Sequence, residues 1–170
     1  MMLKRTRCKL HGFTLLELII VIIVVSTIAS VALNRFLYYQ ERAERAMMES
    51  NLEMVKMGLR IHMAELIASN HAERLLDLER DNPMRWLSEP PVGYAGEYVT
   101  SVKTGNWYFA SKEHELVYVP HSKAYLEMKG DTDGKELRFR AVLQYESNSV
   151  TGTKVPAGIT VIPVNEFKWF

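Results

Sequence analysis

The sequence predicts an α+β protein in which one long N-terminal helix packs against a four-stranded antiparallel sheet. Residues 13–33 form an apolar run with a single charge, and residues 34–69 place apolar side chains at helical spacing without a proline. From about residue 105 onward, apolar and polar residues alternate as they do in strands. The helix stripe and the apolar sheet face each need cover, so we expect them to pack on one another.

Basic residues are concentrated at the start of the chain. Residues 1–12 hold Lys4, Arg5, Arg7 and Lys9 and no acid, whereas the whole chain carries a formal net charge of only +1. The remainder is therefore slightly acidic and shows no basic patch of the kind that nucleic acids bind, so we predict no nucleic-acid partner. Cys8 is the only cysteine, which excludes an intramolecular disulfide.

The apolar run at residues 13–33 is long enough to cross a membrane. As a helix it would measure about 31 Å, close to the roughly 30 Å of a bilayer core. The basic flank should stay in the cytoplasm, which sends the rest of the chain outward. Tyr38 and Tyr39 follow the run closely and suit the aromatic belt at a membrane surface.

Three interpretations of this segment remain open at this point. One is a secretory signal peptide cut after the small residues Ser30 and Ala32, and another is a plain single-pass anchor. The run is longer than the usual signal-peptide core of about 7–15 residues, and neither interpretation accounts for Glu17, the one charge inside it. The third interpretation places a cut between Gly12 and Phe13.

Glu17 is the reason to favour that third interpretation. A carboxylate within a membrane span is costly and normally has a partner and a role. Cleavage after Gly12 would create an α-amino group on Phe13, largely protonated near neutral pH with a reference pKa of about 7.7–8.0. Our hypothesis is that Glu17 of one subunit meets this amine on the next, which would set the register along a fibre.

Residues 7–18, RCKLHGFTLLEL, resemble the prepilin peptidase site of type IV pilins and type II secretion pseudopilins. The resemblance implies cleavage after Gly12, N-methylation of Phe13 and a role for Glu17 in assembly. It also implies the pilin-like form of the α+β fold. The implied partners are other pilin or pseudopilin subunits, the prepilin peptidase, an inner-membrane assembly platform and membrane lipid.

The resemblance implies a structural subunit, a minor pilin or pseudopilin of a type IV pilus or type II secretion pseudopilus, and not an enzyme. Many major pilins have a proline near the place of Asn34 and a C-terminal disulfide, and this chain has neither. These departures weigh against the main shaft subunit of a typical pilus, while a cysteine-free major pilin remains open. The protein is expected in the bacterial inner membrane with its globular part in the periplasm, and then in the fibre.

The expected organisation has four parts. Residues 1–12 are a leader, 13–33 the transmembrane half of the helix, 34–69 its amphipathic half, and 70–170 a globular domain with a connecting loop and the sheet. The alternative is a membrane-tethered or secreted periplasmic binding domain, or a secreted enzyme released after Ala32. The mature N-terminus would distinguish these alternatives.

The amphipathic half predicts one buried stripe and one surface ion pair. Glu41 and Arg45 stand four residues apart and predict modest local support for the helix. Asn70 is the expected end of the helix. The stripe that should face the sheet consists of Leu52, Val55, Leu59, Met63 and Leu66.

The globular part predicts short helices followed by strands. Residues 71–80 suit a short helix, Asn82 and Pro83 suit a helix start, and residues 88–96 read as a turn-rich connection. Strands are expected in residues 106–111, 114–120, 136–145 and 158–164. Pro163 favours an edge position or an early end for the last of them.

The sequence contains no recognisable catalytic or metal-binding constellation. Residues 130–134, GDTDG, lack the further oxygen ligands of a calcium loop and are interpreted as a polar turn. His62 and Glu65 share a helix face, but no second such pair completes a metal site. We therefore expect no metal, no cofactor and no catalytic residues.

Overall fold

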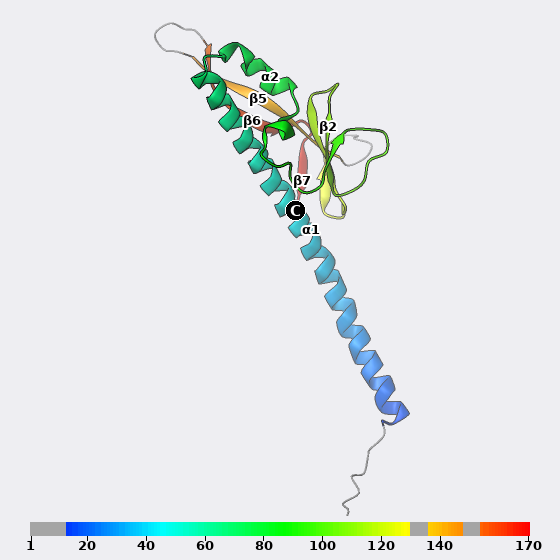
Figure 1. Cartoon of the computed structure of the whole chain (residues 1–170). Helices are drawn as coiled ribbons and strands as arrows, with labels where there is room; N and C mark the ends of the chain where they lie inside the picture. Colours follow the sequence, from blue (N-terminus) through cyan, green and yellow to red (C-terminus); the bar gives the residue numbers. More distant parts are fainter. Residues whose placement is uncertain (1–12, 130–135, 148–153) are drawn as a thin grey trace, which may run out of the picture. The chain divides into compact units, whose positions relative to one another are not determined.

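The computed structural model describes residues 13–129, 136–147 and 154–170. Gly12 and the polar turn predicted at 130–134 lie outside these residues. The chain divides into two compact units, Met1–Gln40 and Glu41–Phe170. A single helix, α1 (Leu15–Ala68), carries the chain from the first unit into the second, as the apolar and amphipathic runs together predict (Figure 1).

Helix α1 ends in the way that Asn70 predicts. Asn70 adopts a left-handed conformation with φ of 58°. The main-chain N–H of Asn70 donates to the carbonyl of Ile67, and that of His71 donates to the carbonyl of Leu66. This pair of hydrogen bonds is a Schellman motif, in which a left-handed residue closes the last helical turn.

Short helices follow α1, as predicted. They are η1 (Ala72–Leu76), α2 (Asp77–Arg80) and η2 (Pro83–Trp86). The Asn82 side chain accepts a hydrogen bond from the Met84 N–H, and Pro83 occupies the first helical position, so this helix start is confirmed.

The main sheet has five strands in the order β1-β2-β3-β5-β6. Its members are β1 (Tyr94–Glu97), β2 (Asn106–Ala110), β3 (Glu115–Val119), β5 (Leu137–Ser147) and β6 (Lys154–Pro163). Strands β2, β3, β5 and β6 pair antiparallel with their neighbours in this order, as the sequence predicts. The predicted number of strands, four, is one too few. The additional strand, β1, begins within the connection predicted at residues 88–96 and pairs in parallel with β2.

A second, two-stranded sheet was not predicted. It pairs β4 (Leu126–Met128) with β7 (Phe167–Trp169). Each strand has three residues, too few for an alternating pattern to register in the sequence. Leu126 and Trp169 nevertheless lie in the main core.

The core of the second unit lies between α1 and one face of the main sheet. Val55, Leu59, Met63 and Leu66 are buried, and Leu52 packs against them half-buried, so the predicted stripe is confirmed. Trp107, Phe139 and Ile159 cover it from the sheet. Pro163 both ends β6 and lies on an edge strand, in agreement with its prediction.

The other face of the sheet carries a smaller apolar cluster and an ion-pair group. Tyr108, Ala110, Val117 and Val119 form the cluster, with Tyr98 and Val102 packed over it. Glu115 is buried beside them and binds Arg138 at 3.3 Å and Arg140 at 2.6 Å. The two guanidinium groups therefore satisfy the buried carboxylate.

Candidate assembly site

The N-terminus of α1 is capped by Thr14. Its hydroxyl oxygen accepts a hydrogen bond from the Glu17 N–H at 3.2 Å, and its carbonyl accepts one from the Leu18 N–H at 3.1 Å. Thr14 and Glu17 thus have the spacing of a capping box, in which a threonine satisfies one of the unpaired N–H groups at a helix start. Sequence reasoning missed this local role, although TLLE is its signature.

Glu17 lies in the first turn of α1, where the helix dipole favours a negative charge. Its side chain is exposed, and it forms no ion pair with any residue that the structure describes. Phe13 is 75% exposed. Phe13 and Glu17, the predicted site residues that the structure describes, are thus both at the surface of the first unit, where another molecule can reach them.

Among the described residues of the first unit, nothing covers the apolar half of α1, and its most apolar stretch is fully exposed. By length and composition this helix can cross a membrane. Exposed leucine, isoleucine and valine side chains at this density require either lipid or other helices around them.

A second stripe, which the sequence analysis did not anticipate, lies on the part of α1 that belongs to the second unit. Its members recur at spacings of 4, 3, 4, 3 and 4, the repeat of a helix that packs lengthwise on another helix. All of them are exposed, and none carries a charge. We call this the outer stripe: Ala43, Met47, Ser50, Met54, Met57 and Ile61.

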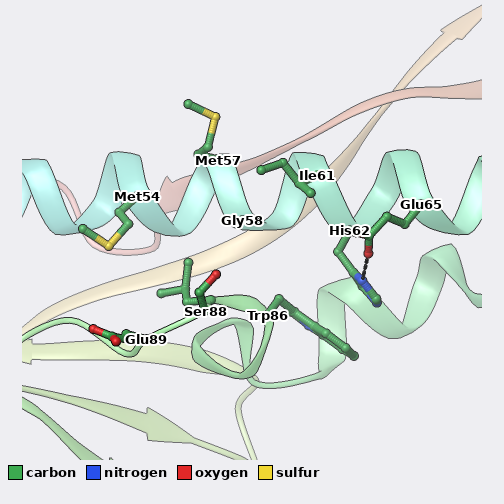
Figure 2. Close-up of a pocket in the computed structure, with 10 residues that line it drawn as sticks. Met54, Met57, Gly58, Ile61, His62, Glu65, Trp86, Ser88 and Glu89 are labelled. Atoms are coloured by element: carbon green, nitrogen blue, oxygen red, sulfur yellow. Dashed lines mark hydrogen bonds and ion pairs between the residues drawn. The ribbon is translucent and has the colours of Figure 1, made fainter.

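A shallow groove opens beside the outer stripe. Met54, Met57 and Ile61 line it from α1, and residues 86–89 line it from the other side (Figure 2). His62 stacks on the ring of Trp86 with centroids 3.9 Å apart and binds Glu65 at 3.1 Å. Gly58 allows the close approach of residues 86–89, because a Cβ there would meet Leu87 Cδ2 at 2.6 Å.

Glu41 is buried, so the predicted surface pair with Arg45 is wrong. Only 1% of Glu41 is exposed. Its Oε1 accepts hydrogen bonds from the Trp169 indole and the Tyr125 N–H, each at 2.9 Å, and its Oε2 accepts one from the Ser122 hydroxyl. Arg45 instead binds Glu49 at 2.8 Å and donates to the Trp169 carbonyl.

The surroundings of Glu41 keep it ionised. Burial raises the pKa of the Glu41 carboxyl, but hydrogen bonds from Ser122, Trp169 and Tyr125 lower it by more, so its pKa lies below the usual value. The carboxylate ties α1 to β7 and to the segment before β4. Sequence reasoning missed this because nothing in the local pattern shows which donors, about 80 and 128 residues away, will surround it.

Glu44 holds the same segment one turn along the helix. Its Oε1 accepts hydrogen bonds from the Tyr118 hydroxyl at 2.9 Å and the His121 N–H at 2.6 Å. Burial and the hydrogen bond to Glu44 raise the pKa of Tyr118, so the phenol stays protonated and donates a hydrogen bond to the Glu44 carboxylate. Together, Glu41 and Glu44 anchor residues 121–125 to α1.

No metal-binding geometry occurs in the described part of the chain. Within residues 13–129, 136–147 and 154–170, no three histidine, cysteine or acidic side chains are placed to hold one ion. The histidines have local roles instead: His62 pairs with Glu65, and His114 lies 2.7 Å from the Arg80 carbonyl.

One family model matches the chain. Residues 7–33 match the prokaryotic N-terminal methylation motif, which spans the predicted cleavage region, Glu17 and the apolar run. Comparison with curated proteins and with solved structures gave no match. The motif, the apolar helix and the α+β fold fit a single-pass protein anchored in the inner membrane. The N-terminal methylation motif at residues 7–33 supports a type IV pilin-like or pseudopilin protein.

Proposed function

We propose that the protein is a structural subunit, a minor pilin or pseudopilin, of a type IV pilus or a type II secretion pseudopilus. The methylation motif at residues 7–33 is the observation that carries this proposal. A prepilin peptidase cuts after Gly12, Phe13 becomes the N-methylated first residue, and an assembly platform moves the subunit from the inner membrane into the fibre.

Glu17 provides the assembly contact at the N-terminus. It is exposed in the first turn of α1 and close in sequence to the new amine of Phe13. Within one helix the dipole already favours the carboxylate, so its charge is partly compensated before assembly. In the fibre it accepts the ammonium of the neighbouring subunit, which removes two charges from the apolar environment together.

The outer stripe provides a second contact between subunits. Its heptad spacing suits a neighbouring helix, and its methionines adapt to an imperfectly matched surface. The globular unit, on the periplasmic side of the membrane before assembly, then lies at the surface of the fibre.

The test begins with the mature N-terminus. Mass spectrometry of the purified protein should show a chain that starts at methylated Phe13, and Gly12→Arg should retain the leader. A start at Leu33 would show a secreted domain, and an intact Met1 would show a plain anchor. Either result would overturn the proposal.

A pair of variants separates the two roles of the capping box. Glu17→Ala should be cleaved normally but lower the fraction of subunit in purified fibres about tenfold, the effect of about 1.4 kcal/mol on an association constant. Thr14→Val removes the cap, worth about 1 kcal/mol, but keeps the carboxylate. Thr14→Val should therefore assemble nearly as well as the parent protein. Equal loss in both variants would mean that Glu17 acts only on its own helix.

A further inference from the structure

The methionine side chains from residue 13 onward fall into an exposed group and a covered group. Met47, Met54 and Met57 are 60%, 46% and 61% exposed. The others are buried or half-buried within the second unit: Met48, Met63, Met84 and Met128. All three exposed methionines belong to the outer stripe, so the exposed thioethers are gathered on one face of one helix.

Helix α1 brings these three thioethers close together. Met54 and Met57 are about one turn apart and Met47 precedes Met54 by two turns, so the group spans about 15 Å of helix. Figure 2 shows the Met57 side chain directed away from Trp86 and Ser88. A small oxidant can therefore reach these sulfur atoms in a subunit that has not yet assembled.

Methionine is the side chain of the mature chain that a peroxide oxidises most readily. Cysteine and methionine are the two residues with readily oxidised sulfur. Cys8 is the only cysteine, and it lies before the proposed cut at Gly12. Once the leader is removed, the exposed thioethers of the outer stripe are the first target that remains.

Oxidation of a thioether by hydrogen peroxide is a balanced two-electron step. The sulfur lone pair attacks one peroxide oxygen, and an S–O bond forms as the O–O bond breaks. The departing hydroxide takes the proton of the transferred oxygen and leaves as water. Sulfur is oxidised and the peroxide is reduced, and the sulfoxide that results is polar where the thioether was apolar.

A sulfoxide on the outer stripe opposes the contact that the stripe makes with another helix. Ser50 is the one member of the stripe with a polar side chain. The stripe of a neighbouring copy therefore offers few donors to the new S=O oxygen. An oxygen that loses water on assembly and gains no hydrogen bond weakens the association.

We propose that Met47, Met54 and Met57 form a site of reversible oxidative modification that controls assembly of the subunit. The oxidant is a peroxide or a hypohalous acid, and a methionine sulfoxide reductase reverses the change. The inference rests on the proposed function, because it takes the outer stripe as a contact between subunits. Before assembly the thioethers are exposed and oxidisable, whereas in the fibre a neighbouring helix covers them.

Peptide mapping by mass spectrometry after hydrogen peroxide treatment locates the modification. In isolated membranes that hold the full-length protein, the three exposed methionines should form sulfoxide at least about tenfold faster than the buried ones, since susceptibility follows exposure. In purified fibres the same three should react about tenfold more slowly than in membranes. Methionine sulfoxide reductase added to the oxidised membranes should restore the thioethers.

A leucine variant separates this modification from general oxidative damage. The triple variant Met47→Leu, Met54→Leu and Met57→Leu keeps the apolar volume of the stripe and should assemble like the parent. A pulse of peroxide should lower incorporation of newly made parent subunit into fibres about tenfold or more but leave the triple variant unchanged. Met128→Leu, a half-buried position outside the stripe, is the matched control and should remain as sensitive as the parent.

Three results would contradict the proposal. They are oxidation of the exposed methionines no faster than of the buried ones, an equal loss of incorporation in parent and triple variant, and no loss in either. The untreated parent distinguishes these from a failure of the proposed function. Its absence from purified fibres before peroxide is added would refute the structural role and the modification site together.

Discussion

Two carboxylates on α1, Glu17 and Glu41, are satisfied in different ways. Glu17 is exposed at the helix start, where unpaired N–H groups and the dipole compensate part of its charge. Glu41 is buried and accepts hydrogen bonds from an indole, a hydroxyl and main-chain N–H groups. The first can take a partner from outside the chain, while the second is already saturated, so only the first suits assembly.

Glu41→Gln should destabilise the second unit by about 1–2 kcal/mol, because hydrogen bonds to a charged acceptor are stronger than those to an amide. Glu41→Ala should cost about 3 kcal/mol, since the Trp169 indole and the Tyr125 N–H lose their acceptor. Urea unfolding followed by tryptophan fluorescence measures both. The control is Glu73→Gln, an exposed acid on η1, which should change little.

The effect of Glu41→Gln on stability should depend on pH. The folded pKa of Glu41 lies below its ordinary value of 4.5, so the unfolded state binds the proton more readily. The stability from this group is therefore complete above about pH 4.5 and is lost as the pH falls through the lower folded pKa. The difference in unfolding free energy between parent and Glu41→Gln should shrink with acidification. A difference that is constant with pH would assign the effect to packing instead.

At the residue scale, the sequence was informative where function depends on local spacing. The positions of Phe13 and Glu17 follow from a contiguous motif, and the family model covers the same residues. The buried position of Glu41 could not be predicted in this way. Four-residue spacing to Arg45 favours a surface pair, but burial against Trp169 decides otherwise, and that contact depends on the tertiary fold.

At the element scale, long periodic segments were predictable and short ones were not. Helix α1 and the strands β2, β3, β5 and β6 each contain enough alternation or helical repeat to identify them. Strands β1, β4 and β7 have three or four residues, and their pairing depends on partners elsewhere in the chain. The outer stripe was missed although its spacing is regular, because the buried stripe already explained why the helix is amphipathic.

Substitutions in the two stripes on α1 should differ in their effect on stability. Leu59 is fully buried between α1 and the sheet, so Leu59→Ala should lower the unfolding free energy by about 2–5 kcal/mol through lost burial and the cavity left behind. Met57→Ala, two residues away on the outer stripe, is the matched control. Its side chain is 61% exposed, and the change should stay within about 0.5 kcal/mol. A large loss in Met57→Ala would mean that the outer stripe is covered within the subunit itself.

At the scale of the whole molecule, apolar surface is distributed unevenly between the two units. From residue 13 onward, the first unit exposes nearly all of its apolar side chains, whereas the second buries a core and exposes an uncharged stripe along its helix. A monomer in water would not tolerate this much apolar surface. In the proposed function, lipid covers the apolar part of α1 before assembly and neighbouring subunits cover this helix and its outer stripe afterwards.

This account predicts a variant that folds but does not assemble. Met54→Lys places a charge in the middle of the outer stripe, on a side chain that is 46% exposed. It should leave the thermal midpoint of the second unit within a few degrees of the parent but lower incorporation into fibres about tenfold or more, because an unpaired charge must be desolvated in the contact. Ala46→Lys adds the same charge at an exposed position of α1 outside the stripe and should assemble normally. Immunoblots of sheared fibres, with membrane fractions as the reference for expression, measure the incorporation of both variants. Normal incorporation of both variants would place the helix contact on another face of α1. An equal loss of incorporation in both would trace the effect to the added charge rather than to the stripe.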